Sequence, residues 1–163
     1  MNLDSLSKLY VHELKDLYSA EKQLVSALPK VIAAARNKDL KKALKDHLQE
    51  TRRQVQRLEK VFDRVGASPH GHKCMGMEGL IKESASMLKE DAEPDVLDAA
   101  IIAAAQRIEH YEMAGYGVAR TYAEKLGDFP AADLLQETLE EEAQADRHLT
   151  RLAERTINIK AMV

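Results

Sequence analysis

Apolar residues along this 163-residue chain recur at steps of three and four, the spacing that places them on one face of an α-helix. The pattern predicts four long helices, over residues 3–36, 38–65, 94–126 and 129–156, and a shorter helix over residues 77–89. Each long helix should have roughly 28–34 residues and be about 40–50 Å long. Because no stretch shows the period of two that marks a β-strand, the chain is predicted to be all-α.

Residues with known helix-end preferences set the boundaries of the first two helices. Asn2 or Asp4 is expected to cap the first helix by accepting a bond from a free backbone N–H. Pro29 lies inside that helix and should kink it without ending it, since the apolar pattern continues beyond. Asn37 is expected to take the left-handed conformation that closes the helix, and Gly66 should end the second helix.

The other two long helices have equally clear limits. Pro94 falls in the first turn of the third helix, where a missing backbone N–H does no harm. Gly127 should end that helix, and Asp128 should cap the fourth, with Pro130 in its first turn.

The lengths of the links predict how the helices are connected. Helices one and two, and likewise three and four, are joined by only two or three residues and must therefore lie antiparallel. The segment of residues 66–93 contains its own helix and is long enough to return along the bundle. Helices two and three would then run parallel. Two helical hairpins joined by one long crossover is the connectivity of ferritin-like four-helix bundles, and residues 1–163 are predicted to form one such domain.

Four glutamates interrupt the apolar stripes of the long helices. Glu21, Glu50, Glu109 and Glu142 each lie within two or three residues of the middle of a different helix. In an antiparallel bundle the middles meet, and a rise of 1.5 Å per residue limits the vertical scatter to roughly 3–5 Å. Glu112 lies on the same face as Glu109. The spacing therefore predicts a cluster of carboxylates at one buried point.

Such a cluster needs positive charge or protons. A buried carboxylate without a partner is unfavourable, and several together repel each other strongly in a medium of low dielectric constant. Two divalent ions would balance the four central glutamates, and oxygen ligands suit Mg, Ca, Mn and iron. A glutamate on an apolar stripe taken singly is more often a half-exposed residue at the flank of the core, but four at one height favour a dimetal site.

Other residues have weaker claims to a role. His47 precedes Glu50 by three residues and is expected either to hydrogen-bond a ligand or to be an ordinary core histidine. Tyr18 lies one turn before Glu21 and could bond to it. His70, His72 and Cys74 alternate in the crossover, where a small second metal site is the less favoured interpretation.

Composition excludes several classes of function. A net charge of −3 gives no sign of a nucleic-acid-binding protein, and no apolar run reaches the length of a membrane span. The N-terminus lacks the features of a signal peptide, and a lone cysteine allows no internal disulfide. A cytoplasmic location is the simplest expectation.

With these residues identified, the chain resembles the ferritin-like superfamily, and more closely the YciF-like bacterial stress-protein family, whose fold is related to that of rubrerythrins. The segments that carry the resemblance are residues 13–24 (ELKDLYSAEKQL), 47–51 (HLQET), 74–80 (CMGMEGL), 109–112 (EHYE) and 138–142 (TLEEE), together with Asp146. It covers nearly the whole chain. It implies a four-helix bundle with a bound metal pair, and a homodimer.

The resemblance also implies roles for single residues. Glu21 and Glu109 would be terminal ligands and Glu50 and Glu142 bridging ligands. Glu112 would match the additional glutamate of rubrerythrin-type sites, and Asp146 would complete the ligand set. The chain departs from typical di-iron bundles, which carry Glu-x-x-His on two helices. Arg53 follows Glu50 and Ala145 follows Glu142 at that spacing. A shell rich in oxygen favours manganese, magnesium or ferric iron.

Two functions follow as hypotheses. The first is a dimetal-carboxylate protein holding iron or manganese, with dioxygen or peroxide as oxidant and a redox role in the stress response. The second is a non-catalytic helical stress or scaffold protein that acts by self-association, through the crossover helix or the apolar C-terminal residues Ile157 and Ile159.

Overall fold

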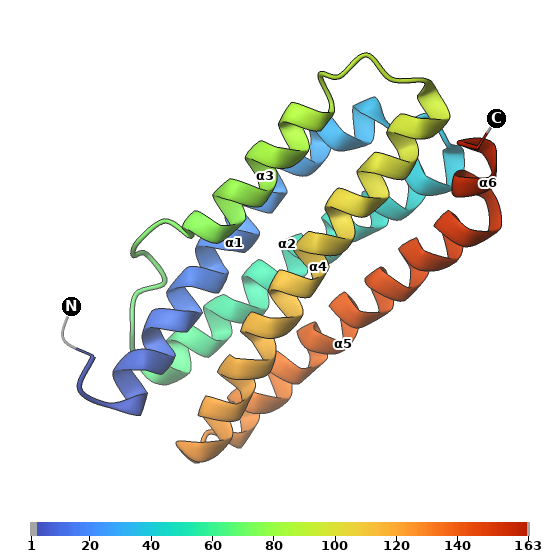
Figure 1. The fold of residues 1–163 in the computed structure, drawn as a ribbon. Helices are drawn as coiled ribbons and strands as arrows, with labels where there is room; N and C mark the ends of the chain where they lie inside the picture. Colours follow the sequence, from blue (N-terminus) through green and yellow to red (C-terminus); the bar gives the residue numbers. More distant parts are fainter. Residues whose placement is uncertain (1–2, 163) are drawn as a thin grey trace.

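A computed structural model, which describes residues 3–162, shows a bundle of four long helices with a shorter helix packed along one side (Figure 1). The helices are α1 (Leu6–Ala34), α2 (Lys38–Val65), α3 (Met75–Met87), α4 (Pro94–Lys125) and α5 (Phe129–Leu152), followed by a π-helical turn η1 (Ala153–Ile157) and a short α6 (Asn158–Lys160). The described residues contain no β-strand, which confirms the all-α prediction.

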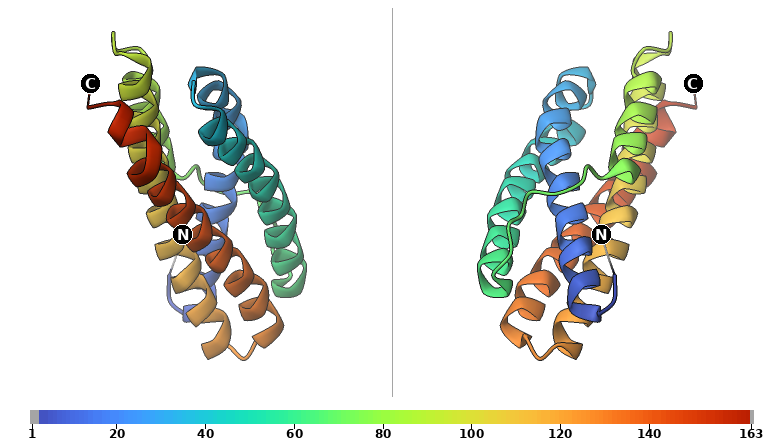
Figure 2. Two further views of the ribbon diagram at one scale, coloured as in Figure 1. Left: turned by 90° about the vertical axis from the view of Figure 1, so that its right-hand side faces the viewer. Right: turned by 90° about the vertical axis from the view of Figure 1, so that its left-hand side faces the viewer.

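The connectivity is also as predicted. Helices α1 and α2 form one antiparallel hairpin and α4 and α5 form the other (Figure 1). The crossover between them carries α3, which packs on α1 and α4 and returns the chain to the end where α2 began. Helices α2 and α4 therefore run in the same direction. The two hairpins pack through α1 on α4 and through α2 on α5, and Figure 2 shows them crossing at an angle.

Most of the predicted helix ends are observed. Gly66 has a φ of 65° just after α2, and Gly127 has a φ of 79° between α4 and α5, a region that favours glycine. The Asp128 side chain accepts a hydrogen bond of 3.3 Å from the backbone N–H of Ala131 and so caps α5. Pro94 begins α4, and α1 passes through Pro29 without a break.

Two predicted caps are wrong. Asn2 lies outside the described residues, and Asp4 instead bonds the ammonium group of Lys8 at 2.8 Å. Ser5 caps α1 through a 3.3 Å bond from the backbone N–H of Lys8, so the helix begins at Leu6 and not at residue 3. Asn37 is not left-handed (φ −64°). Its side chain caps the following helix α2, because its oxygen accepts the first free backbone N–H groups there.

The end of α1 and the start of α3 each differ from the prediction by two residues. Helix α1 ends at Ala34, since Ala35 leaves the helical conformation (ψ 140°). Helix α3 begins at Met75, because the Cys74 sulfur accepts a bond from the backbone N–H of Met77.

The C-terminal end of the bundle contradicts one prediction about exposed residues. Helix α5 ends at Leu152, and the π-helical turn that follows adds a residue to the turn and changes which side chains face the core. Ile157 is consequently buried, with 1% of its surface exposed, and does not form the exposed apolar end that the sequence suggested. Ile159 is exposed.

The core consists of two apolar clusters, one in each half of the bundle. The first contains Tyr10, Leu14, Leu17, Leu58, Phe62, Tyr116 and Leu135, with their neighbours. The second contains Leu24, Leu28, Leu40, Leu44, Ile101, Ile102, Leu149 and Ile157, with theirs. Each long helix contributes to both clusters, so each must cross the boundary between them near its middle.

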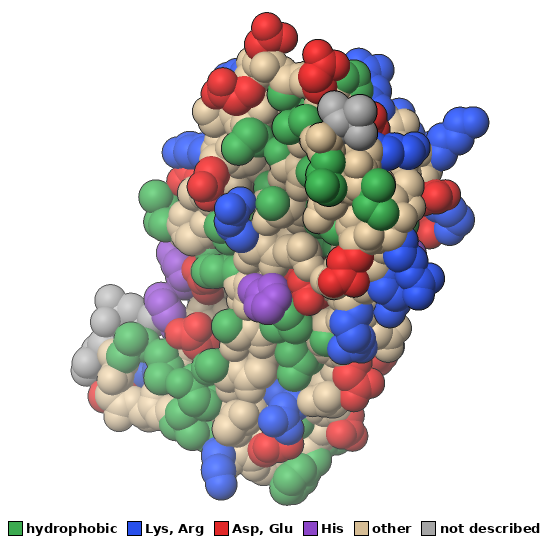
Figure 3. Space-filling view, turned by 45° about the vertical axis from the view of Figure 1, so that its right-hand side comes forward, with side chains coloured by type: hydrophobic (Ala, Val, Ile, Leu, Met, Phe, Trp, Pro, Cys, Tyr) green, Lys and Arg blue, Asp and Glu red, His purple; other side chains and the backbone are tan. Residues whose placement is uncertain are grey.

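The surface of the bundle is a mixture of side-chain types. On the face drawn in Figure 3, charged side chains are interspersed with hydrophobic ones, and the hydrophobic ones gather in small groups near the two ends. None of the helices within residues 3–162 is long and apolar enough to cross a membrane.

A buried carboxylate ties the two hairpins together at one end. Asp98 of α4 is 1% exposed and accepts bonds from two backbone N–H groups in the α1–α2 turn, those of Arg36 (2.8 Å) and Asn37 (2.6 Å). These N–H groups follow the end of α1 and have no helical partner, so Asp98 supplies acceptors that water cannot reach.

We predict that Asp98→Ala lowers the free energy of unfolding by about 2–3 kcal/mol, because two part-buried bonds to a charged group are lost and two backbone donors of the turn lose their acceptors. Denaturant unfolding followed by circular dichroism measures this change. The control is Asp95→Ala, one turn earlier and exposed, which should change stability by no more than about 0.5 kcal/mol. Equal losses of stability in the two variants would show that the bonds of Asp98 to the α1–α2 turn do not stabilise the fold.

Candidate metal centre

A polar layer crosses the bundle at mid-height, between the two apolar clusters. Each of the four long helices supplies to it at least one residue that is almost completely buried. The layer contains Glu21 from α1, His47, Thr51 and Gln54 from α2, Glu109 and Glu112 from α4, and Thr138 and Glu142 from α5. In α1, for example, Glu21 lies between Leu17 of one cluster and Leu24 of the other. The layer is therefore enclosed by hydrocarbon above and below.

Four of these side chains converge on one point. His47, Glu109, Glu112 and Glu142 each offer a ligand atom, and these atoms lie within 4.8 Å of one another. They form the only such group of histidine, cysteine and carboxylate side chains among the described residues. They come from three helices, so the group is a product of the tertiary fold.

Many polar atoms in this group have no hydrogen-bond partner. One carboxylate oxygen of each of Glu21, Glu109, Glu112 and Glu142 is buried without a partner, and so are both ring nitrogens of His47. The closest approach between His47 and Glu109 is 3.4 Å. Buried polar atoms are nearly always hydrogen-bonded, so this many orphaned atoms in one place is unusual. Their close spacing, with ligand atoms of four side chains within 4.8 Å of one another, fits one or more bound cations.

Burial and mutual repulsion oppose ionisation of these carboxyl groups. Burial raises the pKa of Glu21 well above its ordinary value, and the nearby carboxylate of Glu142 raises it further. Burial likewise raises the pKa of Glu109, to which the neighbouring Glu142 adds, and the pKa of Glu112, to which the charges of Glu21 and Glu142 add. Without a cation the cluster must therefore hold protons near neutral pH. With a cation those protons are displaced.

Two hydrogen bonds orient carboxylates of the layer. The hydroxyl of Tyr116 donates to Glu21 at 2.5 Å, and the amide of Gln54 donates to Glu142. In each glutamate the second oxygen has no partner. One oxygen is thus fixed to the protein while the other remains available, an arrangement that holds a carboxylate ready for a cation.

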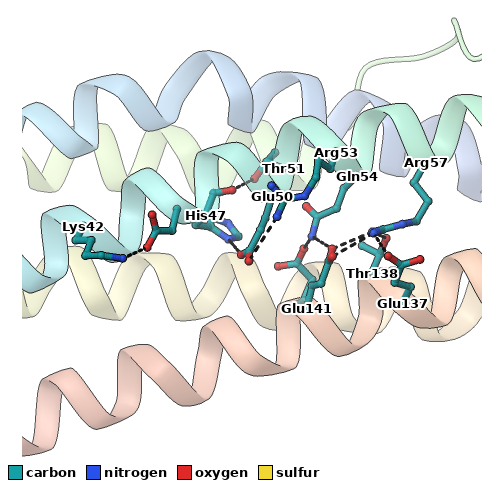
Figure 4. Close-up of polar contacts among 12 residues, drawn as sticks. Lys42, His47, Glu50, Thr51, Arg53, Gln54, Arg57, Glu137, Thr138 and Glu141 are labelled. Atoms are coloured by element: carbon teal, nitrogen blue, oxygen red, sulfur yellow. Dashed lines mark hydrogen bonds and ion pairs between the residues drawn. The ribbon is translucent and has the colours of Figure 1, made fainter.

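A charged network borders the layer between α2 and α5 (Figure 4). Arg57, which is 9% exposed, donates to Thr138 at 2.7 Å, to Glu141 at 2.9 Å and to Glu137 at 2.5 Å. Partial burial works against ionisation of Glu141, but its bonds to Arg57 prevail and lower its pKa. The guanidinium group is therefore paired with Glu137 and Glu141 at the border and does not enter the converging group, which still needs protons or a cation.

The sequence-derived candidates divide into three groups. Glu21, Glu109, Glu112 and Glu142 are buried together in the layer. Glu50 lies at its edge, with a side chain 34% exposed and near His47, and burial raises its pKa. Asp146 lies outside the converging group: its carboxylate accepts a 3.0 Å bond from Gln106 and lies 3.4 Å from the exposed ring of His110.

The structure settles two questions about neighbouring side chains. The expectation that Tyr18 bonds Glu21 is wrong, because the Tyr18 hydroxyl donates to Glu59 at 3.0 Å on the outer side of α1. His47, for which the sequence left two roles open, directs its ring into the converging group.

Tyr116 and Arg57 were missed by the sequence reasoning as partners of the site. Each lies about two turns from a glutamate on its own helix, Tyr116 after Glu109 and Arg57 after Glu50. That shared helix face was the signal that could have indicated them.

The crossover trio does not assemble into a second site. The His72 ring lies 3.2 Å from a carboxylate oxygen of Asp16, and the His70 ring packs edge-on against Tyr18. Cys74 is fully buried with its sulfur 3.0 Å from the hydroxyl of Tyr111, and burial raises the pKa of its thiol. The three side chains thus have three separate environments.

Comparisons with known proteins agree with this architecture. Residues 5–162 match the family described as a domain of unknown function, DUF892. The chain is 45% identical over 162 residues to protein YciF of Escherichia coli strain K12, an alignment that covers 99% of this chain and 98% of YciF.

Solved structures give the same result. The crystal structure of the E. coli stress protein YciF superposes with a TM-score of 0.92 and 44% identity, over 96% of this chain and 99% of that one. The structure of YcfI from Rhodopseudomonas palustris gives a TM-score of 0.89 and 43% identity, over 91% and 95% of the two chains. The protein is a homologue of the stress protein YciF, and the chain belongs to the DUF892 family.

Proposed function

We propose that this protein binds a pair of divalent metal ions, iron or manganese, in the polar layer, and that the pair takes part in redox chemistry. One observation carries the proposal: buried carboxylates and an imidazole converge, within 4.8 Å, with their free lone pairs unpartnered. Carboxylate oxygen suits manganese, and imidazole is accepted by iron, so the mixture of donors can hold either metal. The choice of these two among the metals that fit rests on the resemblance to ferritin-like proteins. The sequence-based expectation of a shell without histidine is replaced by one with His47.

The chain's own residues would hold the metals in the following way. Glu109, Glu112, Glu142 and His47 converge and would provide the inner ligands. Glu21, which is buried near Glu112 and Glu142, and Glu50, at the edge of the layer near His47, would supply further ligands for a second ion. The resemblance to ferritin-like proteins supports a bridging role for Glu142.

Other residues control the orientation and the protons of these ligands. Tyr116 and Gln54 each fix one carboxylate oxygen, so the ligands are positioned before a metal arrives. The apolar clusters on both sides exclude water from the inner side of the layer. When bound, the metal pair would supply electron exchange with dioxygen or a peroxide.

Loss of the Glu112 carboxylate should impair metal binding but leave the fold intact. Isothermal titration of the chelator-treated protein with Mn²⁺ should reveal two bound ions per chain. Glu112→Gln keeps the shape of the side chain but removes its negative charge, and should weaken binding at least about 100-fold or abolish one of the two ions. Its metal-free form should be no less stable than the wild type, because a repelling buried carboxylate has been removed.

The control for this experiment is Glu140→Gln, an exposed glutamate on α5. It should bind Mn²⁺ as the wild type does. Anaerobic addition of Fe²⁺ followed by air or hydrogen peroxide tests the redox part, with ferric absorbance as the signal. A folded wild-type protein that neither binds Mn²⁺ nor binds and oxidises Fe²⁺ would show the proposal to be wrong.

Stability of the metal-free protein should fall as the pH rises. Glu21, Glu109 and Glu112 have pKa values raised in the folded state, so the folded protein binds more protons than the unfolded chain above a pH of about 4.5. Between pH 5 and pH 8 the free energy of unfolding should therefore decrease, by more than about 1 kcal/mol.

Chemical denaturation in the presence of a chelator measures this dependence. Glu112→Gln should make it shallower, since one of the raised carboxyl groups is gone. Saturating Mn²⁺ should reverse it, because protons compete with the metal for the same oxygens. A metal-free protein that gains stability toward pH 8 would contradict the assigned burial of charge.

A further inference from the structure

A hollow of about 420 Å³ opens between α2 and α5 and reaches the polar layer from the surface. In Figure 4, α5 diverges from α2 on the side of His47 and Lys42, away from the Arg57 network. The apolar wall of the hollow consists of Ala43 and Leu44 from α2 and Ala145 and Leu149 from α5. The splay of the two hairpins in Figure 2 continues in this direction.

The inner end of the hollow is formed by the candidate metal centre. His47 and Glu109 line the hollow, and both are more than nine-tenths buried. The ring nitrogens of His47 and one oxygen of Glu109 have no hydrogen-bond partner. Glu21 and Glu112, in contrast, do not line it. A molecule that enters the hollow would therefore meet the His47 side of the polar layer.

The outer rim of the hollow carries positive charge that no carboxylate uses. Three of the four acidic residues of the lining are already engaged: Asp46 with Lys42, Glu141 with Arg57, and Glu50 with Arg53 and His47. The fourth, Glu109, lies at the inner end beside His47. The three basic residues of the rim are Arg147, His148 and Arg151, all on α5. Within the described part of the chain none of these three forms an ion pair, so their side chains are available to bind an anion.

The hollow is much larger than dioxygen or hydrogen peroxide requires. A single water accounts for about 30 Å³ of liquid, so 420 Å³ far exceeds what such small molecules fill. The volume instead lies in the range of roughly 300–1,000 Å³ that is usual for organic ligands. Apolar walls with a few charged groups at one end are also typical of such sites.

We propose that this hollow binds a small organic anion with an apolar body. Its anionic group is bound by Arg147 and Arg151, which lie one turn apart on α5, and its body lies along Leu44, Ala145 and Leu149. The far, uncharged end then reaches His47 and Glu109. Binding of the anion does not require the metal. The inference that its far end is the reacting part of a substrate rests on the proposed function.

The probe for this proposal is sodium octanoate, an anion with a flexible apolar chain. Titration into ¹⁵N-labelled protein, followed by amide chemical shifts, should perturb residues 43–50 and 144–151 in a saturable way. A dissociation constant of about 1 mM is expected for a ligand of this size. Octanol, which has the same chain without the charge, should bind at least about tenfold more weakly.

The double variant Arg147→Ser, Arg151→Ser should weaken octanoate binding about tenfold, and both positions are exposed enough to leave the fold intact. The matched control is Arg107→Ser, an exposed arginine of α4 outside the hollow, which should bind octanoate as the wild type does. Shifts confined to residues outside the hollow, or equal affinity of the double variant and the wild type, would overturn the proposal.

The orientation of the ligand is tested with Mn²⁺ in the polar layer. Paramagnetic relaxation should broaden the terminal methyl resonance of octanoate more than the resonance of the protons next to the carboxylate. The opposite order would overturn the proposed orientation, because it would place the carboxylate at the metals. If Mn²⁺ does not bind at all, the proposed function fails. The chemical-shift map and the arginine variants then still test whether octanoate binds in the hollow.

Discussion

Repulsion among buried carboxylates is the constraint that organises this bundle. Glu21, Glu109, Glu112 and Glu142 are nearly inaccessible to water, and among the described residues no lysine or arginine belongs to their group, which His47 completes. They must be neutralised at one place, by protons or by cations. Because every helix places apolar residues directly above and below the layer, a helix that slid by one turn would push a carboxylate into hydrocarbon. The polar layer thus fixes the register of all four helices.

The stability of the fold must consequently come from the two ends of the bundle. The apolar clusters above and below the layer, with clamps such as Asp98 on the α1–α2 turn, provide it. Arg57 adds charge only at the border, where Glu137 and Glu141 consume it. A guanidinium group placed inside the layer, instead of at its border like that of Arg57, would stabilise the metal-free protein. It would also remove the need for a metal. The present arrangement retains that need.

Periodicity and chain length were enough to predict the helices, the crossover and the height of the glutamates, because these depend on residue spacing alone. Side-chain direction could not be obtained this way. A helical residue turns by 100° from its neighbour, so small errors in the helix axis decide whether Glu50 or Glu141 is the more buried. The same limit applies to Asp146, which turned toward Gln106, and to Tyr18, which turned outward. The π-helical turn that buries Ile157 depends on packing at the end of the bundle and has no comparable sequence signal.

The order of histidine and glutamate on α2 gives the site two unlike sides. Typical di-iron bundles carry Glu-x-x-His, whereas this chain carries His47 three residues before Glu50, which places the imidazole on the side of the α1–α2 turn. That is the side on which α2 and α5 diverge and the hollow opens. The opposite side is closed by Tyr116 and the Arg57 network. A ligand arriving from solvent can therefore approach the layer past His47, and the reversed motif places the one nitrogen donor of the converging group at that approach.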